Sequence, residues 1–296
     1  MEDVNILGLE ITERCNFQCV HCYLERKVKP KINLEIATAI ADIAYDAGFA
    51  AVYITGGEPM LHPQFNEIYE VFRRQGYVVT VYTNASVLRD STLQLFKEIA
   101  PLTVQITMYG MSEETYYATT KVRQFSKVVK NIRRYREEGI NVLLKYHLLT
   151  CTKHDLDEFL SFANELECDI TVNAQIIPML NGDPSPLKYR LNPAEINKFG
   201  LEKEIDFSLS GDGFGSCDAG RNLFIDSQGI VRGCPVLHTN FDQTALDDPA
   251  KAIAYIKQLF EDFHKKRKLP LCPAWLNLEG SIDIKKKILG ASDSST

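Results

Sequence analysis

Residues 6–22 read Ile-Leu-Gly-Leu-Glu-Ile-Thr-Glu-Arg-Cys-Asn-Phe-Gln-Cys-Val-His-Cys, an apolar segment followed closely by three cysteines. Residues 6–11 favour a β-strand, so the cysteines fall in the loop that follows it. In folds built from parallel strands, the reactive groups gather where the strands end. The order of this stretch therefore predicts a sulfur-rich site at the carboxyl end of the first strand.

Short apolar runs and amphipathic helical patterns alternate along the next 150 residues. Asn33 and Gly48 suit the two ends of one helix, as a side-chain cap and a C-terminal glycine. Six strands separated by helices predict parallel βα units, and we expect an α/β fold, a partial (β/α)6 barrel. The expected strands are 6–11, 51–55, 77–83, 102–108, 141–149 and 169–177, and the expected helices are 34–47, 65–75, 91–99, 127–138 and 155–166.

The character of the sequence changes after Ile177. Four prolines lie between 178 and 193, which indicates a loop or a boundary. Residues 223–225 and 230–232 flank the turn 226–229 and predict a small β-hairpin. We therefore expect a core at 1–180, a linker at 181–210 and a small C-terminal hairpin and helix domain at 211–290.

Composition sets limits on the class of protein. The chain has 296 residues, 45% hydrophobic and 24% charged, which are values of a globular protein. Its net charge of −6 argues against nucleic-acid binding, because phosphate recognition requires a basic surface. The polar, acidic start and the lack of a long apolar run argue against a secretion signal and a membrane span. We expect a cytoplasmic protein, in which cysteines serve as ligands or catalysts more often than as disulfides.

The first cysteines, Cys15, Cys19 and Cys22, have the spacing C-x3-C-x2-C. Three thiolates within eight residues can bind one metal site, and iron–sulfur clusters are bound by cysteine thiolates. Three local ligands would leave one iron with an open position, which is typical of a reactive site. The alternatives are a structural zinc site, for which His21 is badly placed as a fourth ligand, and buried free cysteines.

Further candidates follow the later strands. Thr55-Gly56-Gly57-Glu58-Pro59 ends the second strand, where two glycines let the backbone approach a ligand and Glu58 could accept from an ammonium group. Tyr82-Thr83-Asn84 ends the third strand. Thr107 and Lys145 lie on later strands. The alternatives are an ordinary tight turn, an Asx turn and solvated strand residues.

These motifs together resemble the radical S-adenosylmethionine (SAM) enzymes over residues 4–177. The resemblance implies a [4Fe–4S] cluster on Cys15, Cys19 and Cys22, with SAM chelating its open iron and then split to a 5′-deoxyadenosyl radical. It assigns Gly56, Gly57, Glu58 and Pro59 to the methionine amino group, Thr83 and Asn84 to the ribose, and Thr107 and Lys145 to the methionine carboxylate. His21 stands where the family carries an aromatic residue, and Tyr23 beside it is a further candidate SAM contact. No side chain can be assigned as an acid or base.

A second cysteine set flanks the predicted hairpin. Cys217 and Cys234, with the glycines between them, resemble the auxiliary-cluster domains called SPASM and twitch, and Cys272 follows a helix. The resemblance implies a second iron–sulfur cluster on Cys217, Cys234 and Cys272. Its fourth ligand stays open among His238, Asp226, a distant cysteine and substrate, and the alternatives are a degenerate domain and a zinc ribbon. Cys151 and Cys168 match no motif, and we expect structural roles for them.

Residues 176–191 resemble the radical SAM maturases of ribosomally made precursor peptides. The resemblance implies a precursor-peptide substrate that is crosslinked, epimerised or cleaved, and an electron donor such as flavodoxin or ferredoxin. The chain begins at its first strand without the N-terminal recognition domain of many such enzymes, so we expect a separate peptide-recognition protein. The alternatives are a small-molecule dehydrogenase or cyclase and a non-catalytic zinc-binding module.

Overall fold

The computed structural model describes residues 5–25, 30, 32–199, 222–235, 243–244, 248, 250–256 and 258. One sheet runs through these residues in the order β6-β5-β4-β3-β2-β1-β7-β8-β9. Its strands are β1 Asn5–Glu10, β2 Phe49–Thr55, β3 Val78–Thr83, β4 Thr103–Met108, β5 Val142–His147, β6 Asp169–Asn173, β7 Leu223–Ile225, β8 Ile230–Arg232 and β9 Gln243–Thr244.

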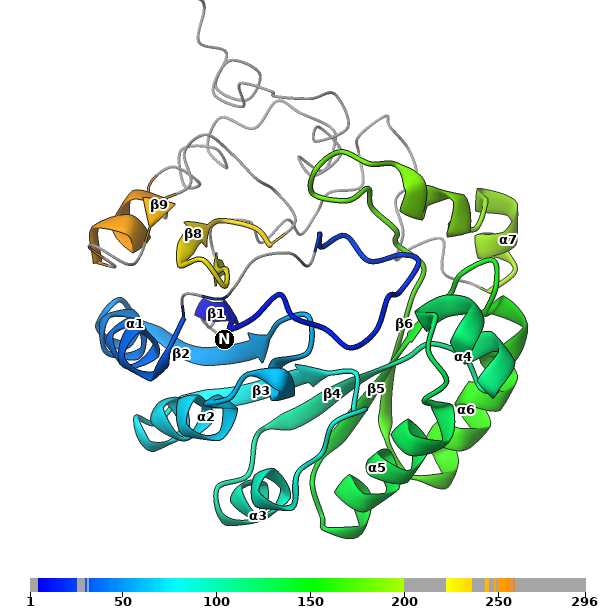
Figure 1. Cartoon of the computed structure of the whole chain (residues 1–296), viewed down its shortest axis with the longest axis horizontal. Coiled ribbons are helices and arrows are strands. Elements are labelled where there is room, and N and C mark those ends of the chain that lie inside the picture. The colour runs from blue at the N-terminus through cyan, green and yellow to red at the C-terminus, as the bar shows by residue number, and fades with distance from the viewer. Residues whose placement is uncertain are drawn as a thin grey trace, which may run out of the picture.

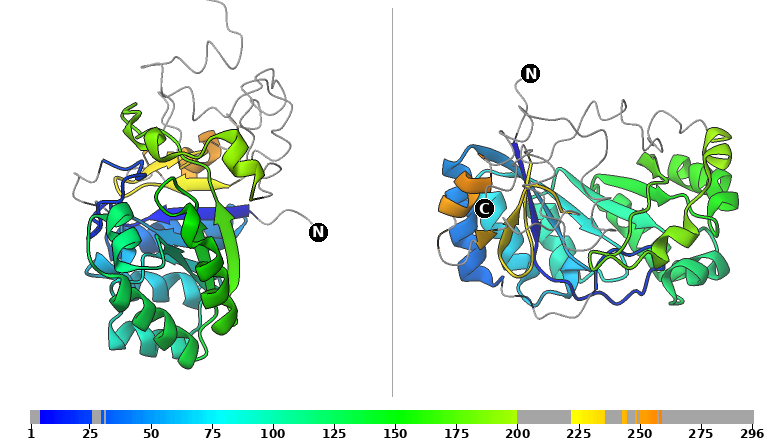
Figure 2. Two further views of the ribbon diagram at one scale, coloured as in Figure 1. Left: turned by 90° about the vertical axis from the view of Figure 1, so that its right-hand side faces the viewer. Right: turned by 90° about the horizontal axis from the view of Figure 1, so that it is seen from above.

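Helices cover the outer side of this curved sheet, as Figures 1 and 2 show. The α-helices are α1 Leu34–Asp46, α2 Phe65–Arg74, α3 Asp90–Glu98, α4 Glu113–Thr120, α5 Phe125–Glu137, α6 Leu156–Glu165 and α7 Pro193–Asn197. Three short 3₁₀ helices are η1 Pro59–Leu61, η2 Lys153–Asp155 and η3 Ser185–Tyr189. The predicted α/β fold with a partial barrel is confirmed, because β1 to β6 pair in parallel in sequence order. No helix in the described part of the chain is long and apolar enough to span a bilayer.

Along β2 and β3, buried residues alternate with less buried ones and so separate two faces of the sheet. Val52 and Ile54 of β2, like Val79 and Val81 of β3, are buried in the main hydrophobic core with the helices. The residues between them, such as Tyr53, are only partly buried and face the inside of the barrel. The outer face therefore supplies stability, and the inner face is left to carry polar and aromatic groups.

The hairpin β7–β8 forms as the sequence predicts, and it extends the main sheet. β7 pairs in parallel with β1, with Gly8 opposite Phe224. Gly8 is required at this point because a Cβ atom there would lie 2.3 Å from the Tyr53 hydroxyl oxygen and 2.7 Å from the Phe224 ring. The predicted division at 181–210 and 211–290 stays a prediction, since most of those residues lie outside the described ranges.

Helix α4 is an element that the sequence analysis does not predict. Its sequence, Glu-Glu-Thr-Tyr-Tyr-Ala-Thr-Thr, lacks the apolar spacing of an amphipathic helix. A capping box forms it instead: the Ser112 side chain accepts from the Thr115 N–H, and the Thr115 side chain accepts from the Ser112 N–H. The helix ends at Lys121, which adopts a left-handed conformation.

Candidate active site

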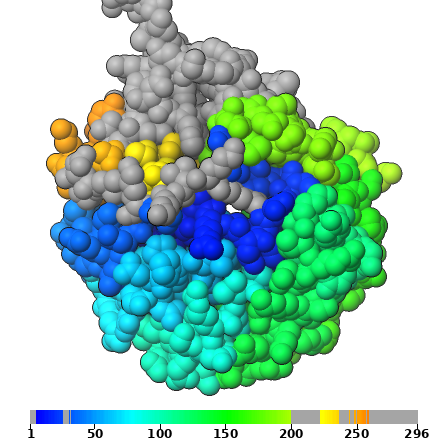
Figure 3. Space-filling view, viewed as in Figure 1, coloured from blue at the N-terminus to red at the C-terminus, as the bar shows by residue number. Residues whose placement is uncertain are grey.

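The cysteine loop, residues 11–25, crosses the carboxyl ends of the strands from β1 to α4 (Figure 1). At its start the Gly57 N–H donates to the Thr12 carbonyl at 2.7 Å. At its far end the Gln18 and Val20 N–H groups donate to the carbonyls at the end of α4, each at 2.9 Å. The loop is therefore fixed to β2 on one side and to α4 on the other. In the space-filling view this dark-blue segment reaches the surface between the green and the yellow segments (Figure 3).

Cys15, Cys19 and Cys22 line one cavity of about 320 Å³. The Cys15 sulfur accepts from the Phe17 N–H at 3.4 Å and from the Asn84 side-chain amide at 3.8 Å. Within the described residues, no three His, Cys, Asp or Glu side chains are gathered closely enough to hold a metal ion. The structure thus brings the three thiols to one cavity without the geometry of a closed ligand set. A shared cavity and a sulfur that already accepts N–H donors fit a thiolate-bound cluster.

The two glycines after β2 lie against the cysteine loop and also line the cavity. A Cβ atom on Gly56 would lie 2.4 Å from the Thr12 carbonyl oxygen, and one on Gly57 would lie 2.3 Å from that of Glu13. Both contacts are with backbone, which cannot yield. The glycines therefore permit the close approach of two loops, and the backbone they expose reaches the cavity.

Glu58 is fully buried and does not line the cavity. Its carboxylate accepts from the Met60 N–H, from the Thr83 hydroxyl at 2.8 Å and from the Asn84 N–H at 2.7 Å. Burial raises the pKa of the Glu58 carboxyl to about 7, against these hydrogen bonds, which lower it. Glu58 thus ties the turn after β2 to the end of β3, while the buried Pro59 begins η1.

Thr83 and Asn84, predicted to contact ribose, are buried at the end of β3. The Thr83 hydroxyl donates a hydrogen bond to the Glu58 carboxylate, and the Asn84 side chain contacts Cys15 and Asn16. Neither residue lines the cavity, and neither does Thr107, which lies opposite Lys145 in the register of β4 and β5. For all three, the contact with SAM stays a prediction.

The opposite wall of the cavity comes from β5, β6 and the loop after β4. Lys145, which the sequence analysis singled out, lies in this wall, and burial lowers the pKa of its amine. His147, two residues further on, lines the same wall, and its ring centroid lies 4.7 Å from that of His21. Burial, with His21 and Lys145 nearby, holds the pKa of His147 well below its usual range.

Several lining residues escape the sequence analysis, among them Tyr109, His147, Asn173 and Gln175. A signal for His147 exists, because strand residues two apart share a face and Lys145 was already a candidate. Asn173 is paired with His147 across β5 and β6, and paired residues of neighbouring strands lie on the same face of the sheet. Among the described residues that line this cavity there is no Asp or Glu, so the polar groups they contribute are neutral or basic.

Tyr23 also lines the cavity, as the sequence analysis proposes for a SAM contact. Its carbonyl accepts from the Leu180 N–H at 2.9 Å, which joins the cysteine loop to the segment after β6. Burial raises the pKa of the Tyr23 phenol well above its usual range, with Glu10 and Cys22 adding to the shift. A neutral phenol is therefore kept at this wall.

Of the second cysteine set, Cys217 and Cys272 lie outside the described residues, as does His238. Cys234 lies two residues after the end of β8 and is partly buried against the main core. Asp226, one candidate for the fourth ligand, forms a buried ion pair with Arg232 at 2.5 Å. The auxiliary cluster therefore stays a prediction.

The sequence profile of the radical SAM superfamily matches residues 9–166, just over half of the chain, so the chain belongs to this superfamily. Its members use a [4Fe–4S] cluster and SAM. The matched range contains the cysteine loop, both glycines and Lys145. The lining residues of β6 and the segment after it, Asn173, Gln175, Ile176 and Ile177, lie beyond the match.

Two similar relatives are named for different biosynthetic roles. The antilisterial bacteriocin subtilosin biosynthesis protein AlbA of Bacillus subtilis (strain 168) is 31% identical over 137 residues, which cover 45% of this chain and 31% of AlbA. A probable GTP 3′,8-cyclase of Saccharolobus islandicus (strain M.14.25 / Kamchatka #1) is 27% identical over 165 residues, 54% of this chain and 53% of that protein. The chain thus matches between about a third and a half of the length of these two relatives.

Solved structures show the same fold. Streptococcus suis SuiB bound to its precursor peptide SuiA matches with a TM-score of 0.72 and 17% identity, over 94% of this chain and 72% of SuiB. Native anSMEcpe with bound AdoMet and the Kp18Cys peptide matches with a TM-score of 0.67 and 16% identity, over 92% of this chain and 88% of that protein. At these identities the likeness is one of fold alone.

Proposed function

We propose that this chain is an enzyme that cleaves SAM reductively and uses the product to take a hydrogen atom from a ribosomal precursor peptide. The observation that carries the proposal is the cavity in which Cys15, Cys19 and Cys22 meet Gly56, Gly57 and Lys145. When bound, the [4Fe–4S] cluster and SAM supply a 5′-deoxyadenosyl radical, which is the chemistry that no side chain can provide.

In this proposal, residues of the chain bind and orient the cluster and SAM. The thiols of the cysteine loop would hold the cluster, and the backbone of Gly56 and Gly57 is open to the methionine amino group. Lys145, the charged group of the opposite wall, would pair with the methionine carboxylate. Ile176 and Ile177 add apolar surface to the cavity, which helps to exclude water from the bound cofactor.

Support for a peptide substrate comes from the relatives. AlbA is by name a bacteriocin biosynthesis protein, and SuiB was solved with a precursor peptide bound. We propose a precursor peptide here too, with a one-electron donor such as flavodoxin or ferredoxin as a second partner. A separate peptide-recognition protein stays a prediction.

The test uses anaerobically reconstituted protein with SAM and dithionite, and measures 5′-deoxyadenosine. The matched control carries Cys15, Cys19 and Cys22 all changed to Ala, while Cys151→Ala and Cys168→Ala control for loss of a thiol elsewhere. The proposal expects product from the wild type and from both single variants, and none from the triple variant. Product from the triple variant, or none from an iron-loaded wild type given both SAM and a precursor peptide that it binds, would contradict it.

A small-molecule cyclase or dehydrogenase is the second candidate function. The similarity to probable GTP 3′,8-cyclases favours it, because that match covers more of this chain than the AlbA match does. Both candidates predict 5′-deoxyadenosine, so the discriminating measurement is which substrate raises its rate. Stimulation by GTP and not by precursor peptides would select the cyclase. A zinc-binding module is disfavoured by membership of the superfamily.

The auxiliary cluster on Cys217, Cys234 and Cys272 is proposed as a second iron site. Changing these three residues to Ala together should lower the iron content of the reconstituted protein by about half, since each cluster of this type holds the same amount of iron. Iron content equal to that of the wild type would exclude the second site. Changing Cys151 and Cys168 together is the matched control and should leave the iron content unchanged.

A further inference from the structure

Asn84 contacts the cysteine loop through its side chain. Its amide nitrogen lies 3.8 Å from the Cys15 sulfur and 3.2 Å from the Asn16 side-chain oxygen. Only 4% of Asn84 is exposed, so water competes little for this amide. The predicted partner of Asn84 was the ribose of SAM, but its polar side-chain atoms are directed to the cysteine loop and to Ser86.

The orientation of the Asn84 amide is fixed by its other end. The Asn84 side-chain oxygen accepts from the Ser86 backbone N–H at 2.9 Å and from the Ser86 hydroxyl at 2.6 Å. A backbone N–H can only donate, so the atom facing it must be the oxygen. The NH₂ end must then face Cys15.

A closed ring of side chains maintains this orientation. The Ser86 hydroxyl donates to Asn84 and accepts from the Asn16 amide at 2.8 Å, and the Asn16 oxygen accepts from Asn84 in turn. Asn16 itself is exposed, so water can weaken its part of the ring. Ser86 is fully buried and is the firmer support.

The backbone of the same turn is fixed independently of the ring. The Asn84 N–H donates to Glu58, and Ala85 adopts a left-handed conformation with φ of 55°. The Ala85 carbonyl accepts from the buried side chain of Asn131 of α5 at 2.8 Å. Asn131 thus supports the backbone of this turn through Ala85 and is not a member of the side-chain ring, which makes it a matched control.

We propose that Asn84 is an N–H···S donor to the Cys15 thiolate when Cys15 ligates the [4Fe–4S] cluster, and that it makes the cluster easier to reduce. Ser86 and Asn16 are the positioning residues that aim its amide. An added electron places more negative charge on the sulfur ligands, and a donor hydrogen bond stabilises that charge, so it raises the reduction potential. The Phe17 N–H also donates to the same sulfur. This inference rests on the proposed function.

The test is a redox titration of the reconstituted holoenzyme. Electron paramagnetic resonance monitors the titration through the cluster signal that changes when SAM is added. Asn84→Leu keeps the approximate size of the side chain and removes both N–H donors. In Asn84→Ser the new side chain is too short to reach Cys15. Both should lower the midpoint potential, and Ser86→Ala should lower it less. Asn131→Leu should leave the potential unchanged while it lowers the stability of the protein.

The outcomes separate this inference from the proposed function. A wild type without a SAM-sensitive signal refutes the proposed function, and with it the premise of the inference. A wild-type signal whose potential is the same in Asn84→Leu and Asn84→Ser overturns the inference alone. The same holds if these variants raise the KM for SAM without a shift in potential, because that result returns Asn84 to the ribose. If Asn84→Leu does not load a cluster, Asn84→Ser and Ser86→Ala decide the matter by the same criterion.

Discussion

Two buried carboxyl groups, those of Glu10 and Glu58, have raised pKa values. Glu10 at the end of β1 is 3% exposed and accepts from the Ser227 N–H at 3.2 Å. Burial raises the pKa of the Glu10 carboxyl from 4.5 to about 8, with the charges of Glu13 and Asp226 adding to the shift. Glu58 has more hydrogen-bond donors and a smaller shift, to about 7. Ionisation of either buried carboxyl group therefore destabilises the fold.

The raised pKa of Glu10 predicts how stability depends on pH. Between pH 4.5 and about 8 the folded protein holds a proton that the unfolded chain has lost, so this group makes the free energy of unfolding fall as pH rises through that window. Glu10→Gln keeps an acceptor for Ser227 and removes the titration. The variant should be more stable than the wild type at pH 9, by about 5 kcal/mol, with the difference shrinking as pH falls from about 8 and absent below pH 4.5. Urea unfolding at several pH values measures it, with the exposed Glu67→Gln as control. A difference independent of pH would contradict the account.

Glu58→Ala should destabilise the protein by about 2–4 kcal/mol, because it leaves three buried donors, on Met60, Thr83 and Asn84, without their acceptor. The cost of burying the carboxylate itself offsets part of this loss. Urea unfolding of the metal-free protein at pH 6 measures the change. The exposed Glu98→Ala is the control and should change stability by less than about 0.5 kcal/mol. A loss below about 1 kcal/mol for Glu58→Ala would argue against the tie between β2 and β3.

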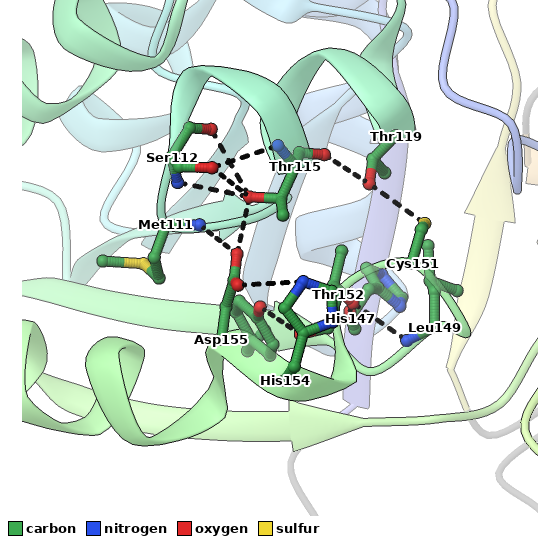
Figure 4. A network of polar contacts seen from close by, with 11 residues as sticks. Met111, Ser112, Thr115, Thr119, His147, Leu149, Cys151, Thr152, His154 and Asp155 are labelled. Atoms are coloured by element: carbon green, nitrogen blue, oxygen red, sulfur yellow. Dashed lines mark hydrogen bonds and ion pairs between the residues drawn. The ribbon is translucent and has the colours of Figure 1, made fainter.

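At the scale of elements, α4 supports the cysteine loop, a role that its sequence pattern does not predict. Figure 4 shows its support: the Asp155 carboxylate accepts from the Met111 N–H at 2.8 Å and from the Thr115 hydroxyl at 2.5 Å. The Thr119 hydroxyl lies 3.4 Å from the Cys151 sulfur, and the structural role expected for that cysteine stays a prediction. Since α4 binds the cysteine loop through Gln18 and Val20, Asp155 supports that loop from a distance.

Asp155→Ala should loosen the cysteine loop. Without the carboxylate, the start of α4 loses its tie to the loop after β5, so the amide protons of Gln18 and Val20 should exchange faster with solvent. Hydrogen–deuterium exchange of the metal-free protein measures this directly, and a stability loss of roughly 1–3 kcal/mol should accompany it. The exposed Asp157→Ala is the matched control. Unchanged exchange in the loop of Asp155→Ala would show that α4 is held by other contacts.

The elements differ in how far the sequence predicts them. The six strands and most of the helices follow from runs of Val, Ile and Leu and from helical spacing, because these local patterns dictate which face is buried. α4 escapes because a capping box forms it rather than an apolar stripe. The cysteine spacing and Gly-Gly-Glu-Pro identify the site, but the contacts of Glu58 and Asn84 depend on packing between segments far apart in the chain.

At the scale of the whole molecule, the first strand joins the parallel strands of the barrel to the C-terminal hairpin. β1 lies between β2 and β7, and the Asn222 side chain accepts from the Ile6 N–H across 216 positions of sequence. The sequence predicts the hairpin but not its partner, because no local pattern encodes a pairing over such a distance. The strand β8, which ends two residues before Cys234, thus belongs to the same sheet as β1, which precedes the cysteine loop.

Gly8→Ala tests this arrangement. The added methyl group would meet the Tyr53 ring and Phe224, so we expect a loss of about 1–3 kcal/mol in the free energy of unfolding. A second change, Tyr53→Leu, removes the ring and should recover part of the loss in the double variant. Gly8→Ala without any effect on stability would contradict the packing of β1 between β2 and β7.

The measurement that tests the central claim most directly is electron paramagnetic resonance of the reduced, reconstituted protein with and without SAM. If Cys15, Cys19 and Cys22 hold a cluster with an open iron, SAM should change the spectrum of the wild type. The variant with all three changed to Ala should show no signal that responds to SAM, whatever iron its other cysteines retain. A wild-type spectrum that SAM leaves unchanged, or a SAM response that persists in the triple variant, would contradict the account.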